Sequence, residues 1–295
     1  MNKPSSPAPA ACLQSAAAAA AGTPPERHWR IPAAGVIGLA VIFLWMAAAV
    51  FGPWMLAADS GDMSDAAVFA PMGGAHWLGT DYLGRDVLSR IVEGARYTVG
   101  VALAATLCAS VAGTTLALLA AARGGMIDAL ISRSLDTLVS VPSKMFALLM
   151  VAAFGASVSM LVLIAAIVYA PGAYRIARAL AVNIGAMDYV TVARTRGEGT
   201  WYVMRREILP NIAGPMLSDL GLRFVYVVLL LAGMSFLGVG IQPPDADWGS
   251  LVRENIGGLS EAAPAIIAPA LAIASLTIAV NLAIDALGGS HRRSE

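Results

Sequence analysis

The chain has 295 residues, of which 58% are hydrophobic and 13% are charged, and its formal net charge at pH 7 is zero. Because soluble domains carry about 25% charged residues, this composition indicates a membrane protein, and the balanced charge gives no support for a nucleic-acid-binding protein. The two cysteines, Cys12 in a polar tail and Cys108 in an apolar run, exclude a disulfide framework.

Residues 1–30 are rich in proline, serine and alanine. No long apolar run follows the basic residue Lys3, so the segment lacks the pattern of a secretory signal. We expect residues 1–30 to form a disordered cytoplasmic tail.

Six apolar segments follow, each close to the 20 residues that a helix needs to cross a bilayer. Pro142 and Lys144 weaken the third segment, and Pro171 with Gly172 interrupts the fourth, which suggests kinks. Proline is tolerated in such helices where neighbouring helices satisfy the backbone, so we expect a packed bundle. The sequence predicts an all-α membrane protein with six transmembrane helices at 31–56, 98–122, 135–154, 158–179, 216–237 and 263–287, the last five forming a core over 98–290.

Arginine and lysine are distributed unevenly between the segments that join these spans. If the N-terminus is inside, most arginines fall in the inside segments, while aspartate and glutamate gather in the outside segments. The positive-inside rule then predicts that both termini are cytoplasmic. The outside segments are 57–97 and 241–262, and the largest basic loop, 186–211, is cytoplasmic.

An amphipathic helix is predicted within the first outside segment. Asp86 suits its N-cap, and Asp86 and Arg90 have the i,i+4 spacing of an ion pair. We expect this helix to lie on the membrane surface as a collar before the second span. Arg85, Arg90, Glu93 and Arg96 are expected to face away from an apolar stripe of Val87, Leu88, Ile91, Val92 and Ala95.

The loop 186–211 carries two helical patterns. A first helix is expected to begin at Asp188, whose charge suits a helix N-terminus, and to end at Gly197, which fits the left-handed C-terminal position. Thr200 is expected to cap a second helix, and Pro210 to end it. Apolar residues lie on several sides of the first helix, so it should bury against either anionic lipid or a protein partner.

Two smaller features lie further along the chain. The prolines at 243–244 should break the chain before a short helix over 247–256, with Trp248 at the lipid interface. At the start of the fifth span, Asp219 and Arg223 are spaced i,i+4 and are expected to neutralise each other.

The basic loop also resembles a known family. The run DYVTVARTRG, followed by ILP eleven residues after Gly197, is similar to the EAA loop of ABC-transporter permease subunits. In that resemblance Thr191, Val192 and Ala193 stand at the Glu-Ala-Ala positions, and Gly197 stands at the glycine. Thr191 and Val192 depart from the pattern, and Glu207 stands where the family has isoleucine.

Two further stretches resemble the C-type permease subunit of dipeptide, oligopeptide and nickel importers: LGTDYLGRDVLSRIVEGARYTVG at 78–100 and SFLGVGIQPPDADWGSLV at 235–252. The resemblance implies the type I ABC importer permease fold. It also implies a permease for di- or oligopeptides or a related small solute such as nickel, which couples ATPase closure to alternating access through 188–210. The coupling residues it implies are Asp188, Tyr189, Thr191, Val192, Ala193, Arg194, Gly197, Leu209 and Pro210.

The same resemblance implies partners and a location. The partners are a second permease subunit in a heterodimer, two cytoplasmic ATPase subunits, a periplasmic solute-binding protein and the lipid bilayer, in the inner membrane of a bacterial cell. For the first outside segment, the collar is one interpretation. A docking surface for the binding protein, formed by Asp81, Arg85 and Asp86, is the other.

Motifs for catalysis are missing from the sequence. Neither Lys3 nor Lys144 lies in the Gly-Lys-Ser/Thr sequence of a phosphate-binding loop, so we expect ATP hydrolysis by separate subunits and no enzyme activity here. His28, His76 and His291 lie outside the apolar spans, so neither a metal site nor a cofactor is expected. The alternatives are an ion-coupled secondary transporter that acts without an ATPase, and a membrane scaffold without flux.

Overall fold

The computed structural model describes residues 33–55, 67–74, 76–260 and 263–292. The expected tail at 1–30 lies outside them, as do parts of both outside segments. Apart from one isolated bridge between Thr80 and Asp86, the described residues form helices and irregular connections only. The predicted all-α architecture is therefore confirmed.

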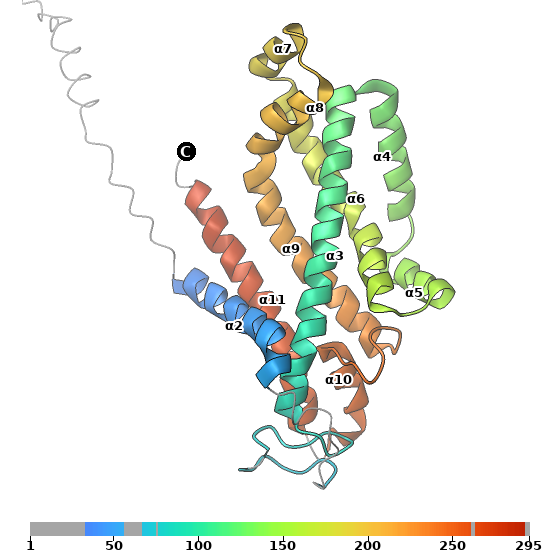
Figure 1. Cartoon of the computed structure of the whole chain (residues 1–295), viewed down its shortest axis with the longest axis vertical. Coiled ribbons are helices and arrows are strands. Elements are labelled where there is room, and N and C mark those ends of the chain that lie inside the picture. Colours follow the sequence, from blue (N-terminus) through green and yellow to red (C-terminus); the bar gives the residue numbers. More distant parts are fainter. Residues whose placement is uncertain (1–32, 56–66, 75, 261–262, 293–295) are drawn as a thin grey trace, which may run out of the picture. The chain divides into compact units, whose positions relative to one another are not determined.

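In chain order the elements are α2 (Ala33–Met55), α3 (Val87–Arg123), α4 (Gly125–Val139), α5 (Ser143–Phe154), α6 (Val158–Gly185), α7 (Asp188–Thr195), α8 (Thr200–Tyr202), the π-helical turn η1 (Val203–Ile208), α9 (Leu209–Phe236), α10 (Trp248–Glu254), the short 3₁₀ turn η2 (Ile256–Gly258) and α11 (Ala263–Arg292). Figure 1 shows α7 and α8 at one end of the bundle and α10 at the other. We call these the α7 end and the α10 end.

Within the described part of the chain, five helices are long and apolar enough to cross a membrane: Ala33–Gly52, Val87–Arg123, Val158–Gly185, Thr200–Phe236 and Pro264–Ala286. The pair α4 and α5 makes a sixth crossing if its two helices, bent by 85°, count together. The third span, predicted at 135–154 with Pro142 as a weak point, is broken there, because Pro142 lacks an amide proton and disfavours helical geometry in the residue before it. The chain therefore breaks between α4 and α5.

The helix α3 is continuous over 37 residues. The amphipathic helix and the second span, predicted as separate elements, are two parts of one rod. Asp86 is the N-cap, as predicted, since its carboxylate accepts a hydrogen bond from the Ser89 amide at 2.8 Å. The predicted Asp86–Arg90 pair is wrong: Arg90, expected to face away, is buried and donates to Glu93 at 3.0 Å.

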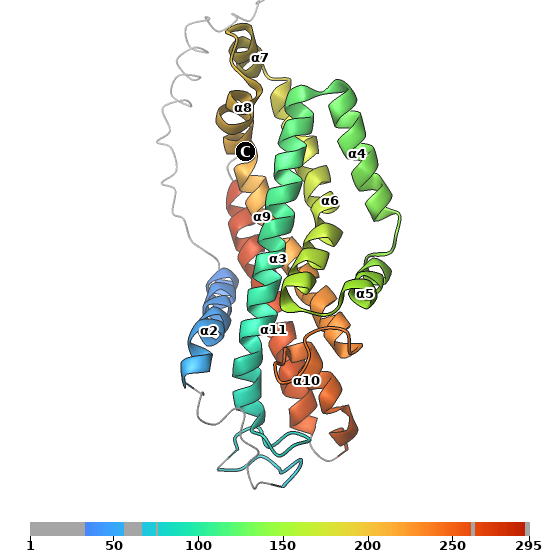
Figure 2. The ribbon, with the colours of Figure 1, turned by 45° about the vertical axis from the view of Figure 1, so that its right-hand side comes forward.

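The contact between α3 and α6 forms the centre of the bundle, where the two helices run side by side (Figure 2). Gly113 marks a point of close approach. A Cβ atom there would lie 2.6 Å from the Ala170 carbonyl oxygen and 2.6 Å from the Ala173 Cβ. Helices in membranes associate through such small residues, and those fully buried in this contact region include Ala102, Ala105, Ala109, Ala173 and Ala177.

We expect Gly113→Leu to push α3 away from α6 and to lower the thermal midpoint of the detergent-purified protein by on the order of 5 °C or more, because overpacking costs about 1–3 kcal/mol. Gly100→Leu is the matched control, since no atom lies within 4 Å of a Cβ at that position of the same helix. Its midpoint should stay near that of the wild type. Equal midpoints for the two variants would contradict the close contact.

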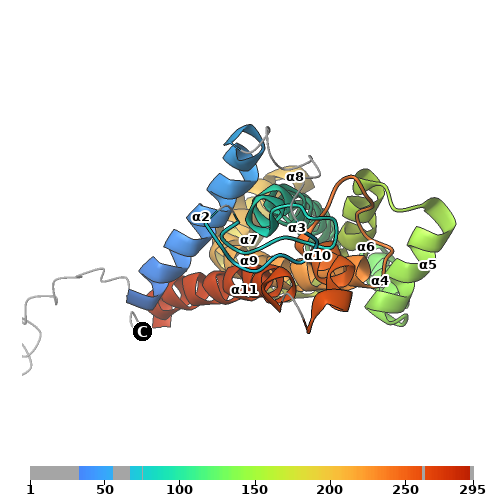
Figure 3. The ribbon, with the colours of Figure 1, turned by 90° about the horizontal axis from the view of Figure 1, so that it is seen from below.

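The helix α2 packs along α11 and α3, and Figure 3 shows α2 beside α11. The Trp45 indole donates a hydrogen bond to the Ser275 hydroxyl at 2.9 Å and packs edge-on against Trp248 at 4.6 Å between ring centroids. The opposite side of α2 is typical of a lipid-facing helix. The large side chains exposed there include Phe43, Phe51 and Trp54.

Candidate functional site

The short helix α7 is held against α6 and η1 by one apolar stripe. It begins at Asp188, as predicted. Val190 and Ala193 are fully buried, and Val190 belongs to an apolar cluster with Met204 and Ile208 of η1. Because residues three apart lie on one helix face, α7 is anchored on that face. Its inward side therefore rests on the protein itself, not on lipid.

A left-handed glycine ends α7. Gly197 has φ 82°, its amide donates to the Arg194 carbonyl at 3.0 Å, and the Glu198 amide donates to the Ala193 carbonyl at 3.2 Å. These two bonds satisfy the last carbonyl groups of the helix and need a positive φ, which glycine adopts without a steric penalty. The predicted left-handed position of Gly197 is confirmed.

The second helix of the loop differs from its prediction. It begins at Thr200 itself, so this residue is not the cap. Pro210 does not end it either, because the chain continues through η1 into α9 as one span, Thr200–Phe236. In η1 the Leu209 amide bonds to the Met204 carbonyl, five residues earlier. Such a widened turn accommodates the proline that follows. The sequence pattern alone did not indicate this turn.

The outward side of the loop exposes apolar and aromatic side chains beside arginines. Among the predicted coupling residues only Ala193 is buried. Trp201 and Tyr202 were overlooked, although two adjacent aromatic residues in a polar loop were a usable signal; Trp201 is 68% exposed. Exposed apolar groups gathered in this way mark interaction sites. The exposed predicted residues are Asp188, Tyr189, Thr191, Val192, Arg194, Gly197, Leu209 and Pro210.

Comparison with known proteins decides the family. Residues 113–293 match the family described as binding-protein-dependent transport system inner membrane component. The chain belongs to this family. The resemblance of the loop to ABC importer permeases is therefore confirmed, and the permease is a multi-pass membrane protein.

Two relatives match over most of their length. The permease is 34% identical over 251 residues to a permease protein of Brucella suis biovar 1 named for a peptide transport system, covering 85% of this chain and 84% of the relative. It is 31% identical over 274 residues to the dipeptide transport system permease protein DppC of Haemophilus influenzae, covering 90% and 93%. A crystal structure of an amino acid ABC transporter aligns over 70% of this chain and 93% of that chain at 19% identity and a TM-score of 0.49, which is too distant to assign residue roles.

At the α10 end of the permease, a carboxylate holds the turn before α3. Asp81 is 1% exposed, and it accepts hydrogen bonds from the Leu83 amide at 2.8 Å and the Arg85 amide at 2.9 Å. Although burial disfavours the guanidinium charge, the hydrogen bond and the charge of Asp81 raise the pKa of Arg85. Asp86 caps α3 and lies 3.2 Å from His76 Nδ1. All three predicted docking residues make polar contacts within this segment, and Arg85 Nη2 also lies 3.7 Å from the Glu254 carboxylate of α10.

The helix α10 reaches into the core from this end. Trp248 is fully buried; its indole donates to the Ile91 carbonyl at 2.8 Å, and its amide donates to the Thr98 hydroxyl at 3.0 Å. Its predicted position at the lipid interface is wrong, because the indole N–H finds its partner inside the protein. Gly94 leaves room for the ring, since a Cβ there would lie 3.3 Å from it.

A buried ion pair within α9 is linked by a hydrogen bond to α6. As predicted, Arg223 pairs with Asp219, with 2.6 Å from Nη2 to Oδ2. Arg223 Nη1 also donates to the Tyr169 carbonyl at 2.7 Å, and the Tyr169 hydroxyl donates to the Tyr226 carbonyl at 2.9 Å. Gly172 leaves room for the guanidinium, since a Cβ there would lie 2.8 Å from Nη1. The sequence interpretation took this glycine, next to a proline, as part of a kink, and did not connect it with Arg223.

Proposed function

We propose that the permease imports small peptides and that separate ATPase subunits drive it through loop 186–211. The relatives named for peptide and dipeptide transport support the substrate class. The two sides of α7 support the coupling role, because Val190 and Ala193 anchor it inward while Tyr189 and Val192 are exposed outward. A helix that is fixed on one side and exposes apolar side chains among charged ones on the other is suited to bind a partner and to pass its movement to the bundle.

A continuous rod supports transmission from this loop to the opposite end. The span Thr200–Phe236 includes α8, η1 and α9. At its far end α9 packs on α10, where Gly249 lies so close to Ala232 that a Cβ would clash. A displacement of α7 would thus reach the α10 end through packed helices. ATPase binding shifts the bundle only if it favours one arrangement over another.

We place the α7 end in the cytoplasm and the α10 end in the periplasm. The arginines of the loop support this orientation through the positive-inside rule, and the family description supports the inner membrane of a bacterium. Both termini are then cytoplasmic. The proposed organisation is a tail at 1–30, a first span at 31–56, a periplasmic segment at 57–97, and a core at 98–290 with a second periplasmic loop at 241–262.

The assembly that we propose contains a second permease subunit, two ATPase subunits and a periplasmic binding protein. ATP hydrolysis then belongs to the ATPase subunits, and this chain is not an enzyme. For the binding protein, we propose that Asp81, Arg85 and Asp86 fix the shape of the docking loop. The exposed Met72 and Trp77 of the same loop supply apolar contact area.

The variant Gly197→Val tests the coupling role. A branched side chain at φ 82° costs at least about 1–2 kcal/mol and would change how α7 ends, so ATP-dependent dipeptide uptake by the reconstituted complex should fall about tenfold or more. Insertion should persist, since no atom lies within 4 Å of the added Cβ. Gly185→Val, also in open space but without a positive φ, is the matched control and should retain most uptake.

Equal uptake by the two valine variants would contradict a coupling role for the end of α7. Vesicles that contain the permease without ATPase subunits should accumulate no peptide. Accumulation in such vesicles would instead favour an ion-coupled secondary transporter.

A further inference from the structure

An ion pair lies exposed on helices that cross the membrane. Arg175 of α6 donates to Asp136 of α4 at 2.7 Å, and their side chains are 54% and 59% exposed. The 28 residues of α6 span about 42 Å, and Arg175 lies about 15 Å from the end at Gly185. The hydrocarbon layer is about 30 Å thick. A central placement of α6 therefore puts Arg175 inside this layer, where lipid is an unfavourable neighbour for exposed charge.

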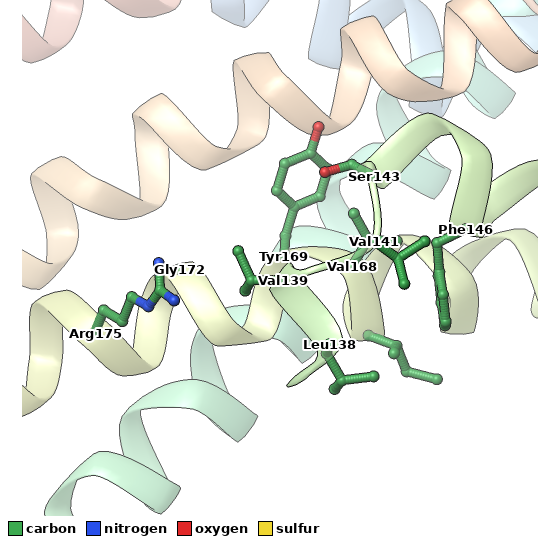
Figure 4. Close-up of a pocket in the computed structure, with 10 residues that line it drawn as sticks. Leu138, Val139, Val141, Ser143, Phe146, Val168, Tyr169, Gly172 and Arg175 are labelled. Atoms are coloured by element: carbon green, nitrogen blue, oxygen red, sulfur yellow. The ribbon is translucent and has the colours of Figure 1, made fainter. Parts of the chain in front are cut away.

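A cavity opens beside this pair, and Arg175 is one of its lining residues, whereas Asp136 lies outside the lining. It has a volume of about 160 Å³ and lies where the break between α4 and α5 faces α6. In Figure 4 the Tyr169 ring lies beside Ser143, Val141 and Phe146 lie at the same end of the row of lining residues, and Arg175 lies at the other end. The walls are thus mainly apolar, and one end carries charge. Such a combination is typical of sites for small molecules.

A second ion pair, one turn further along α6, has a different environment. Arg178 binds Asp128, and this carboxylate also accepts hydrogen bonds from Ser132 and Tyr174. The Arg178 and Asp128 side chains are 37% and 21% exposed, and neither lines the cavity. By contrast, Arg175 is the one hydrogen-bond partner found for Asp136 among the described residues. The Arg178 pair is a fixed link between α4 and α6. The exposed side of the Arg175 pair, by contrast, leaves hydrogen-bonding positions free for a ligand.

We propose that this cavity binds the peptide during its passage, with Arg175 binding the terminal carboxylate and Asp136 binding the terminal ammonium group. The inference rests on the proposed import of peptides and adds a contact site within the permease. A zwitterion can replace the mutual contact of Arg175 and Asp136 by two new contacts, and the net charge in the membrane stays zero. The apolar walls then accommodate the peptide side chains.

The proposed site favours short peptides. The termini of an extended dipeptide lie about 7 Å apart, a separation that the long, exposed side chain of Arg175 can open by rotating away from Asp136. The termini of longer peptides are too far apart to reach both groups. Because the groups of this bridge are exposed in the permease, the bridge is weak, which lets the solute leave again.

The test uses the complete complex in vesicles, with its ATPase subunits and binding protein, and measures dipeptide uptake and ATP hydrolysis together. Arg175→Gln and Asp136→Asn should each lower the dipeptide moved per ATP hydrolysed by about tenfold, the effect expected from losing one charge-assisted hydrogen bond. Arg178→Gln is the matched control on the same helix, and should lower this ratio much less. If Arg178→Gln lowers it equally, the Arg175 pair is only structural and the proposal fails.

A second measurement asks whether water or a protein partner covers the cavity. Ser143→Cys, in a background with Cys12→Ser and Cys108→Ala, places a thiol in the lining. A charged thiol reagent should label it during ATP turnover, and a dipeptide should slow labelling. No labelling in any nucleotide state would show that the second permease covers this face, and would overturn the proposal.

If the wild-type complex shows no ATP-dependent peptide uptake, the proposed function itself fails. If the wild-type complex transports peptide and the Arg175→Gln complex transports it equally well, only this inference fails.

Discussion

Asp219→Leu is expected to prevent stable folding of the permease, and Asp219→Leu combined with Arg223→Met is expected to restore it. The single substitution leaves the buried Arg223 charge with the Tyr169 carbonyl as its remaining hydrogen-bond partner among the described residues. Removing one partner of a buried ion pair costs about 3–5 kcal/mol, whereas replacing both by apolar residues of similar volume is often neutral or stabilising. The cost of the single substitution is thus a large part of the free energy of unfolding, which is roughly 5–15 kcal/mol for most proteins.

The measurement is the thermal midpoint and the monodisperse yield of each purified variant. Arg223→Met alone should also be unstable, because it leaves the Asp219 carboxylate buried without its cation. The combined variant is the control, since it removes both charges and keeps the side-chain volume. If Asp219→Leu is as stable as the combined variant, the Arg223 guanidinium is hydrated in the membrane protein and does not depend on this pair.

Local signals in the sequence predicted much of the fold. The i,i+4 spacing of Asp219 and Arg223, the N-cap at Asp86 and the left-handed turn at Gly197 each depend on residues a few positions apart. The hydrophobic pattern gave the apolar spans for the same reason, because a helix displays its periodicity within its own sequence. The EAA-like spacing indicated the family, and matching relatives confirmed it.

Features that depend on contacts between helices were not predictable in this way. Trp248 was placed at the lipid interface because its sequence gives no sign of the Ile91 carbonyl that accepts its indole N–H. Gly172 suggested a kink, although its lack of a side chain makes room for a guanidinium on another helix. Pro210 was expected to end a helix, whereas a π-helical turn lets the chain continue. In each case the neighbouring helices, and not the local sequence, determined the outcome.

Two valines of α7 should give opposite defects when each is changed to aspartate. Val192 is exposed and Val190 is fully buried, two positions apart on the same helix. Val192→Asp places a charge on the outward face without affecting the core, so the permease should fold normally and retain about tenfold less ATPase subunit during purification, as expected for a contact in an interface. Val190→Asp buries a charge against Met204 and Ile208, so α7 should detach from the bundle.

Detachment of α7 has a different signature from loss of the partner. With Val190→Asp the ATPase can still bind the exposed face of α7, but its movement no longer reaches η1 and α9, so ATP is hydrolysed with peptide uptake near background. The measurements are the ATPase subunit retained, ATP hydrolysis and uptake, made on the same reconstituted samples. Val192→Asp that retains the ATPase and transports like the wild type would exclude the outward face as the contact. Normal uptake by Val190→Asp would show that the anchored stripe is not needed, because a loosely tethered helix could then transmit the movement equally well.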